Sequence, residues 1–377
     1  MSTIPPSSGP PASGPPYAGG PSAVSSFGSS ASAPQQVIIQ QQATALGRYG
    51  KILLILLGLA IMSIVGLVSS YQSYFSPPGG PQERYHSLSK EATDKIAIVT
   101  VAGTIMEGEG FVKEQLDRVR EDDDIVAVVL RVDSPGGTVT GSDYLYHHIK
   151  DLCEERDLPL VVSMGSICAS GGYYIAMAVG EQEDTIFAEP TTWTGSIGVV
   201  IPHYDFSGML AEYKVKDDSI ASHKYKLMGS PTRVLDEAGR AEERKLFQEL
   251  VDLSFQGFKE IVRSGRPKFR ADDGALDAVA TGQIFTANQA FEKGLVDKIG
   301  FIETAIERAA ELAGRDPDNV RCVTYVEPPA SLRSLLSAKT QQSGVLGGDL
   351  RTLLDLTAPR AYYLCTWLPS ILSNSKP

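Results

Sequence analysis

The stretch IVAVVLRVDSPGG, residues 125–137, decides the fold that the sequence predicts. It is an apolar, valine-rich run that ends in a polar turn with two adjacent glycines, Gly136 and Gly137. Runs of similar character stand before and after it, KIAIVTVAGTI at 95–105 and LPLVVSM at 158–164. Short runs rich in Val and Ile suit strands that are buried on both faces of a sheet. We therefore predict core strands at all three positions.

Helical patterns alternate with these predicted strands. Residues 111–120 and 142–156 have a helical pattern, and a longer amphipathic pattern covers 237–264. Alternation of strand, helix and strand is typical of βαβ units around a parallel sheet. The predicted fold class is therefore α/β with a parallel sheet.

An apolar segment precedes this predicted core. Residues 52–68 read ILLILLGLAIMSIVGLV, and residues 69–71 extend the run to the length of a membrane-spanning helix. A cleaved signal peptide is the alternative, but a long segment precedes the run and no A-x-A site follows it. Arg48 and Lys51 lie on the N-terminal side, which places the N-terminus in the cytoplasm by the positive-inside rule. We predict a single-pass anchor with the body outside the cytoplasm.

Composition divides the rest of the chain. Residues 1–47 are rich in Pro, Ser and Gly and are predicted to be a disordered tail, with the anchor at 48–71 and a linker at 72–92. The body is predicted to cover 93–328, and 329–377 form a C-terminal extension. The apolar part of that extension, 361–372, is predicted to pack on the body as a strand or helix, or else to contact the membrane surface.

Composition also excludes several classes of function. The 377 residues carry 34 basic and 45 acidic side chains, and a net charge of −11 argues against a nucleic-acid binder. The sequence contains no Walker phosphate loop, no H-E-x-x-H and no G-x-S-x-G elbow. The four cysteines show no disulfide or zinc spacing. The acidic run 121–124 lacks the spacing of a calcium loop and is predicted to be a solvated turn.

Three short segments remain as candidates for chemistry. In D-S-P-G-G at 133–137, the Gly pair at a strand end can turn backbone N–H groups toward an oxyanion, although a plain turn has the same sequence. In A-S-G-G-Y-Y at 169–174, Ser170 follows a predicted turn at 165–168 and opens a helix, where it is either a nucleophile or an N-cap. The N–H of Gly171 would then join that of Gly137 as a second donor. In K-Y-K-L-M-G-S-P at 224–231, a desolvated lysine can serve as a general base.

Together these segments resemble the signal peptide peptidase A family, membrane-anchored serine proteases with a Ser–Lys dyad. The resemblance runs from about residue 95 to residue 310 and rests on five segments in the right order. These are D-S-P-G-G, S-x-x-A-S-G-G-Y-Y within 163–174, T-G-S-I-G-V at 194–199, Y-K-x-x-G-S-P at 225–231, and G-Q-I-F-T-A-N-Q-A-x-x-x-G-L-V-D at 282–297.

The resemblance implies a role for each matched residue. Ser170 is the nucleophile and Lys226 the general base, with Lys224 as the second candidate. Ser196 hydrogen-bonds the lysine and orients it. Gly137 and Gly171 form the oxyanion hole. No metal and no organic cofactor is needed.

The resemblance also implies a fold and a setting. The fold is the Clp-protease/crotonase type, a superhelix of ββα units with a parallel sheet. Members of this length resemble enzymes that assemble into rings, in which the dyad is completed between neighbouring subunits. The implied substrates are extended, apolar peptides at the membrane, such as cleaved signal peptides, and the implied reaction is endopeptidase hydrolysis.

Three other interpretations stay open at this point. His203, with Asp205 or another acid, could make a Clp-type Ser–His–Asp protease on the same fold. An acyl-CoA hydratase or isomerase of the crotonase type would use the same glycine-based oxyanion hole. A catalytically silent membrane scaffold would use the proline-rich head as a ligand.

Overall fold

The computed structural model describes residues 45–75, 80–327 and 361–364. The chain divides into two units, Met1–Tyr71 and Gln72–Pro377. The predicted disordered tail lies almost wholly outside the described residues, as does most of the C-terminal extension.

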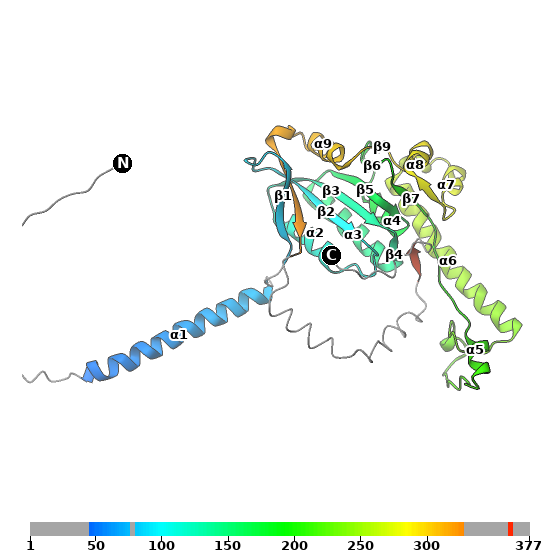
Figure 1. Ribbon diagram of the computed structural model, residues 1–377, viewed down its shortest axis with the longest axis horizontal. Coiled ribbons are helices and arrows are strands. Elements are labelled where there is room, and N and C mark those ends of the chain that lie inside the picture. Colours follow the sequence, from blue (N-terminus) through cyan, green and yellow to red (C-terminus); the bar gives the residue numbers. More distant parts are fainter. Residues whose placement is uncertain (1–44, 76–79, 328–360, 365–377) are drawn as a thin grey trace, which may run out of the picture. The chain divides into compact units, whose positions relative to one another are not determined.

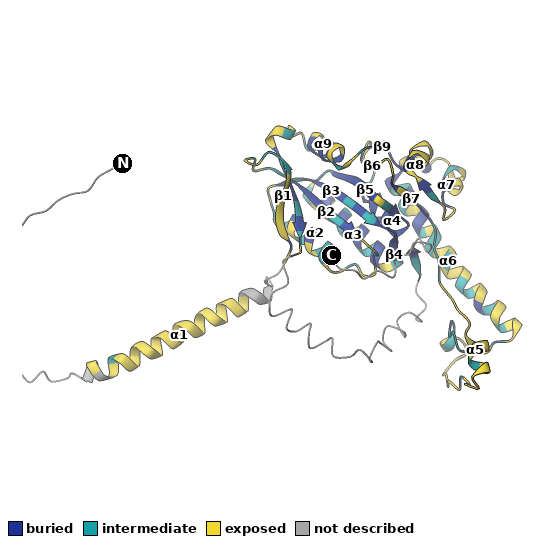
Figure 2. Ribbon diagram, viewed as in Figure 1, coloured by how far each residue is buried: buried dark blue, intermediate teal, exposed yellow. Residues whose placement is uncertain are grey.

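Most of a long helix, α1 (Ala45–Phe75), belongs to the first unit. Its segment Tyr49–Tyr71 is, among the described residues, the one helix long and apolar enough to cross a membrane. Its apolar side chains are exposed along this length, as Figure 2 shows. At about 1.5 Å per residue, the segment exceeds the roughly 30 Å of a bilayer core.

The second unit is built on a mostly parallel sheet (Figure 1). The strand order is β1-β10-β2-β3-β5-β6-β9, and β7 pairs with β5 and with β8. All pairings are parallel except β1 with β10 and β7 with β8. The strands are β1 (Gln82–Leu88), β2 (Lys95–Ala102), β3 (Ile125–Ser134), β5 (Leu160–Ala169), β6 (Ile186–Ala188), β7 (Trp193–Gly195), β8 (Ile284–Thr286), β9 (Lys298–Ile299) and β10 (Arg321–Val326). A separate two-stranded sheet joins β4 (Gly136–Thr138) to β11 (Tyr362–Leu364).

Helices cover both faces of the large sheet. The helices of this unit are α2 (Phe111–Glu121), α3 (Val139–Arg156), α4 (Gly171–Ala176), α5 (Ser207–Glu212), α6 (Glu237–Gly265), α7 (Asp273–Val279), α8 (Ala287–Lys293) and α9 (Ile302–Leu312), with short 3-10 turns η1 (Met177–Val179), η2 (Lys224–Leu227), η3 (Pro267–Phe269) and η4 (Pro317–Asn319). Side chains alternate along β2, so that Val99 packs in the core with α2 and α3, while Ile98 packs in the core with α9. The prediction of α/β with a parallel sheet buried on both faces is confirmed.

The element boundaries in the structure differ from those that the sequence predicts at three places. Strand β1 lies inside the predicted linker 72–92, because its polar residues pair along the sheet edge with β10. Residues 165–168 are not a turn, since β5 continues to Ala169 and pairs there with β7. Helix α3 begins at Val139 rather than residue 142, because the Thr138 side chain accepts a hydrogen bond from the Gly141 N–H.

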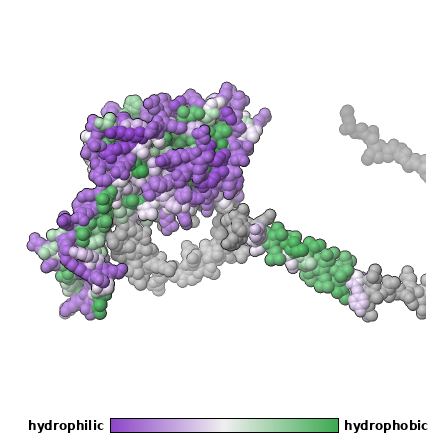
Figure 3. Space-filling model, turned by 180° about the vertical axis from the view of Figure 1, so that it is seen from behind, coloured by the Kyte–Doolittle hydropathy of each residue, from purple (hydrophilic) through white to green (hydrophobic). Residues whose placement is uncertain are grey.

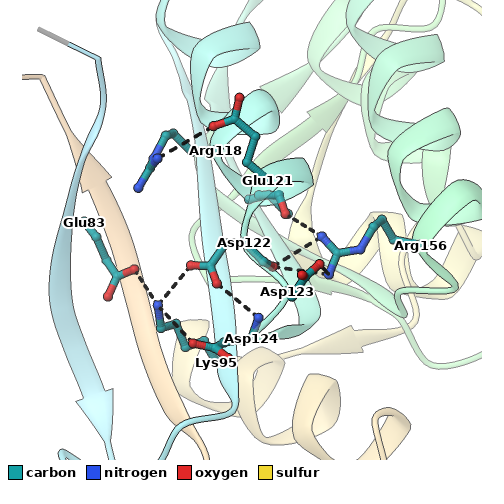
Figure 4. Close-up of polar contacts among 9 residues, drawn as sticks. Glu83, Lys95, Arg118, Glu121, Asp122, Asp123, Asp124 and Arg156 are labelled. Carbon is teal, nitrogen blue, oxygen red and sulfur yellow. Dashed lines mark hydrogen bonds and ion pairs between the residues drawn. The ribbon is translucent and has the colours of Figure 1, made fainter. Parts of the chain in front are cut away.

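The acidic run is tied to the chain's own cations (Figure 4). The Lys95 ammonium lies 2.9 Å from the Asp122 carboxylate and 3.0 Å from Glu83 of β1. The Arg156 guanidinium donates to the backbone carbonyl of Asp122. The prediction of a solvated turn therefore holds for Asp123, which is fully exposed, but not for Asp122.

Candidate active site

Ser170 lies at the junction between β5 and α4 and is buried, with 1% of its surface exposed. Its backbone N–H donates to the Gly195 carbonyl at 2.8 Å, and its own carbonyl accepts from the Tyr174 N–H at 2.9 Å. Ser170 occupies the N-cap position of α4, yet its side chain makes no capping hydrogen bond. The hydroxyl is therefore not used as a helix cap, which was the alternative role for this serine.

The backbone of Ser170 is strained. It has φ 54° and ψ −115°, a conformation that residues with a side chain seldom adopt. Such a conformation costs about 1–3 kcal/mol and persists where the surrounding structure enforces it. Here the hydrogen bond to Gly195 and the buried helix α4 fix the turn on both sides.

Three glycines lie beside this serine. A Cβ placed on Gly137 would lie 1.7 Å from the Ile105 carbonyl oxygen, so the position has no space for a side chain. A Cβ on Gly171 would lie 3.1 Å from the Gly137 nitrogen. A Cβ on Gly136, where φ is 96°, would lie 2.6 Å from the Gly171 nitrogen. The structure thus brings the two predicted oxyanion-hole glycines together next to Ser170.

Ser196 directly follows β7, the strand that pairs with the end of β5 just before Ser170. Its side chain is buried, its φ is 51°, and its N–H donates to the Gln283 carbonyl at 2.7 Å. The preceding residue, Gly195, is the one that accepts the hydrogen bond from Ser170. Ser196 is therefore held in the same structural layer as the serine, one strand away.

The lysine is not brought to the serine within one chain. Lys226 lies on η2, in the segment between α5 and α6, and its side chain is exposed. No hydrogen bond or ion pair joins it to Ser170 or Ser196, all of which the structure describes. Figure 1 shows α5 at the end of α6 that extends away from the sheet.

The neighbouring lysine has a different environment. The Lys224 ammonium is hydrogen-bonded to the Glu242 carboxylate, which also accepts a hydrogen bond from the Tyr225 hydroxyl. The bond to Glu242 raises the pKa of Lys224 above its usual value. A general base must lose its proton near neutral pH, so Lys224 is the poorer candidate.

The histidine of the competing triad is engaged elsewhere. His203 is exposed and its ring lies 5.8 Å from that of Phe247, in a cavity whose lining residues do not include Ser170. The Asp205 carboxylate accepts hydrogen bonds from the N–H and hydroxyl of Ser207, which lowers the pKa of Asp205. It also pairs with Arg240. The structure therefore joins neither His203 nor Asp205 to the serine.

Cys168 stands two residues before Ser170 and is fully buried. Burial raises the pKa of its thiol, so that it stays protonated and unreactive. Among the residues that the structure describes, no three His, Cys, Asp or Glu side chains are arranged to hold a metal ion.

Sequence reasoning missed two residues at the site, Gly136 and Tyr363. The signal for Gly136 was its position in the Gly pair that contains Gly137. Tyr363 comes from the C-terminal extension, and its carbonyl oxygen lies 2.2 Å from the position that a Cβ on Gly136 would take. A contact between residues so far apart in sequence leaves no local pattern.

A strained, buried serine beside paired glycine amides is the arrangement of a serine hydrolase. Comparison with known proteins identifies the family to which this hydrolase belongs. The model of peptidase family S49 matches residues 153–316. A protein of Synechocystis sp., named as a protease, is 37% identical over 250 residues, which cover 66% of this chain and 84% of that one.

Two further relatives carry more specific names. The chloroplastic serine protease SPPA of Arabidopsis thaliana is 34% identical over 70% of this chain and 39% of its own length. A protein of Enterococcus faecium named as a signal peptide peptidase SppA is 37% identical over 51% of this chain and 53% of its own. The chain therefore spans about half or less of these two relatives. It belongs to the signal peptide peptidase A family of proteases, peptidase family S49.

Proposed function

We propose that this chain is a membrane-anchored serine endopeptidase that hydrolyses apolar peptides, with Ser170 as nucleophile and Lys226 as general base. The observation that carries this proposal is the geometry of Ser170. It is a buried serine with a strained backbone and a hydroxyl that caps no helix, directly beside Gly137 and Gly171.

Each residue has a defined part in the reaction. A neutral Lys226 takes the proton of the Ser170 hydroxyl, whose oxygen attacks the peptide carbonyl. The N–H groups of Gly137 and Gly171 hold the negative charge that develops on the carbonyl oxygen. The lysine then gives its proton to the leaving amine, and water hydrolyses the acyl-enzyme. Ser196 orients the lysine.

The proposal requires Lys226 to come from a second copy of the chain. The segment that carries it exposes large apolar side chains, which water disfavours. Figure 3 shows apolar residues on this projecting part of the body. The large side chains exposed in residues 204–234 include Tyr204, Met209, Tyr213, Val215, Ile220 and Val234. Covering them with a neighbouring copy would desolvate η2, and desolvation lowers the pKa of a lysine.

The anchor supports the assignment of substrate and location. Helix α1 would hold the body at a membrane, where cleaved signal peptides and other apolar peptides remain. Arg48 and Lys51 at its N-terminal end favour a cytoplasmic N-terminus, with the body on the other side of the membrane. Two of the relatives are named for this class of enzyme.

Hydrolysis of an apolar signal peptide by the detergent-solubilised full chain tests the proposal. We expect Ser170→Ala and Lys226→Ala each to lower kcat by a factor of about a thousand or more. Lys224→Ala is the matched control, since it removes a lysine from the same turn. Loss of activity in Lys224→Ala with retention in Lys226→Ala would reassign the base. Full activity in Ser170→Ala would overturn the proposal.

A further inference from the structure

Helix α6 contacts the segment that carries Lys226, residues 223–233, through a buried glutamate, Glu243. One carboxylate oxygen of Glu243 accepts a hydrogen bond from the Gly229 N–H at 3.3 Å. The other oxygen lies 3.2 Å from the Arg233 guanidinium. The Glu243 side chain is 8% exposed, so that water competes little for either contact. Glu243 therefore holds the chain at a point shortly after the proposed base.

The contacts on the other side of Lys226 are exposed. Glu242 accepts hydrogen bonds from the Lys224 ammonium and from the Tyr225 hydroxyl. The side chains of Lys224 and Glu242 are 60% and 39% exposed, and an ion pair in contact with water contributes little to stability. Among the described residues, the buried polar contacts between this segment and α6 are thus those of Glu243.

Two further contacts fix the segment less firmly. The Phe206 N–H donates to the Pro231 carbonyl at 2.6 Å, but Phe206 belongs to the same projecting part of the body. Asp205 pairs with Arg240 of α6 at 3.3 Å, yet these two side chains are 45% and 57% exposed. Without Glu243, the segment would keep no buried polar contact to the helix among the residues that the structure describes.

Further along, α6 is fixed beside the proposed nucleophile. Phe258 of α6 is fully buried, and its ring lies 5.2 Å from that of Tyr174 of α4. Ser170 is the N-cap residue of α4. The helix between Glu243 and Phe258 spans roughly 22 Å, at about 1.5 Å per residue. A continuous helix thus joins the surroundings of the serine to the residue that holds the lysine segment.

We propose that Glu243 is a positioning residue for the general base, and that it holds Lys226 in the place from which it acts. This inference rests on the proposed function, in which Lys226 takes the proton of the Ser170 hydroxyl. Glu243 takes no part in the proton transfer itself. It acts through the Gly229 N–H and the Arg233 guanidinium, whose positions set that of the lysine.

Hydrolysis of an apolar signal peptide by the detergent-solubilised full chain tests this role. Glu243→Ala removes both contacts, and we expect kcat to fall about tenfold or more, because a shift of about 1 Å in a reacting group can slow a reaction a hundredfold. KM should stay within about twofold of the parent value, since Ser170 and its glycines are unchanged. Glu243→Gln keeps an acceptor for the Gly229 N–H and should be about threefold or more faster than Glu243→Ala.

Glu249 is the matched control for Glu243. It is an exposed glutamate of the same helix, and no hydrogen bond or ion pair joins it to another described residue. Glu249→Ala removes the same charge from α6 and should keep the kcat of the parent. A kcat of Glu243→Ala equal to that of Glu249→Ala would overturn the inference.

Mixtures of two inactive chains separate positioning from a general loss of structure. A Ser170→Ala chain supplies only the lysine, and a Lys226→Ala chain supplies only the serine. Added to the first chain, Glu243→Ala should lower the activity of the refolded mixture about tenfold or more. Added to the second chain, it should leave that activity nearly unchanged. Equal losses in both positions would show that Glu243 acts on the fold, which overturns the inference.

The outcomes also distinguish this inference from the proposed function. If Lys226→Ala abolishes hydrolysis while Glu243→Ala keeps the parent kcat, the proposed function stands and the inference is wrong. If Lys226→Ala keeps its rate, the proposed function fails and this inference fails with it. If the mixtures stay inactive without any change at Glu243, the single variants decide, and a Glu243→Gln protein as slow as Glu243→Ala would overturn the inference.

Discussion

The backbone N–H of Ser170 donates to the carbonyl of Gly195 at 2.8 Å. This hydrogen bond joins the turn after β5 to the end of β7, and Ser196 follows Gly195 directly. The position of the proposed nucleophile is thus fixed by the sheet itself. A strained serine turn is held on one side by a strand and on the other by the buried helix α4.

The strain at Ser170 makes a prediction about stability. Glycine adopts positive φ without penalty. The free energy of unfolding of Ser170→Gly should therefore be about 1 kcal/mol larger than that of Ser170→Ala. Both variants should be inactive. Urea denaturation of the two proteins measures the difference.

The control for that comparison is Ser166, an exposed serine of β5 with ordinary φ. There the order should reverse, because glycine in a strand loses more backbone entropy than alanine. A Ser170→Gly protein less stable than Ser170→Ala would show that the turn is not strained.

The close packing of Gly137 against the Ile105 carbonyl leads to a prediction about activity. Gly137→Ala would place a carbon 1.7 Å from the Ile105 carbonyl and displace the backbone N–H that we assign to the oxyanion. We expect kcat to fall at least a hundredfold, the usual effect of losing an oxyanion donor. The kcat of peptide hydrolysis is measured for each variant, and circular dichroism checks that the variant is folded.

Gly257 of α6 is the matched control, since a Cβ there has no atom within 4 Å. Gly257→Ala should keep its activity and gain about 0.5–1 kcal/mol of stability, because alanine is the better helix former. Equal losses of activity in both variants would contradict the assignment of Gly137.

Three buried thiols should be unreactive in the folded protein. Burial raises the pKa of Cys153 and of Cys322 to about 12, and raises that of Cys168 as well. At pH 8 their thiolate fraction is then lower than that of an ordinary cysteine by about a thousandfold. Iodoacetamide should label them after unfolding but not before, as read by peptide mass spectrometry. Rapid labelling of Cys168 together with loss of activity would instead make it part of the site.

The Lys95 cluster predicts a particular pH dependence of stability. Burial lowers the pKa of Lys95, but hydrogen bonds to Asp122 and Glu83 outweigh it, and the folded pKa lies above 10.5. A raised pKa contributes stability that is fully present below pH 10.5 and is lost as pH rises through the folded value. Lys95→Gln should therefore lower the free energy of unfolding by about 1 kcal/mol at pH 7. The difference from the parent should be the same at pH 9 and should shrink only above pH 10.5. If the stability difference between Lys95→Gln and the parent disappears by pH 9, the Lys95 cluster is not the cause of that difference.

The elements that the sequence predicted share one property, a strong local pattern. The core strands β2, β3 and β5 are runs of β-branched residues, and α6 has a long amphipathic repeat. Strand β1 falls within the predicted linker 72–92: its polar residues carry no local strand pattern, and only its pairing with β10 makes it a strand.

The same distinction applies to the site. Ser170, Gly137 and Gly171 were predictable because they lie in short motifs at the ends of core strands. The pairing of β11 with β4 was not, because it depends on a contact between distant segments. The single chain does not bring Lys226 to Ser170, and the dyad completed between neighbouring subunits, which the resemblance implies, stays a proposal.

The most direct test of the shared Ser–Lys dyad is a mixing experiment with two inactive variants. Ser170→Ala and Lys226→Ala chains are unfolded together, refolded in equal amounts and assayed for peptide hydrolysis. If Ser170 of one copy works with Lys226 of its neighbour, about a quarter of the sites in the mixture carry both groups and activity returns to about that fraction of the parent. Mixtures that assemble like the parent but stay inactive would contradict a dyad shared between copies.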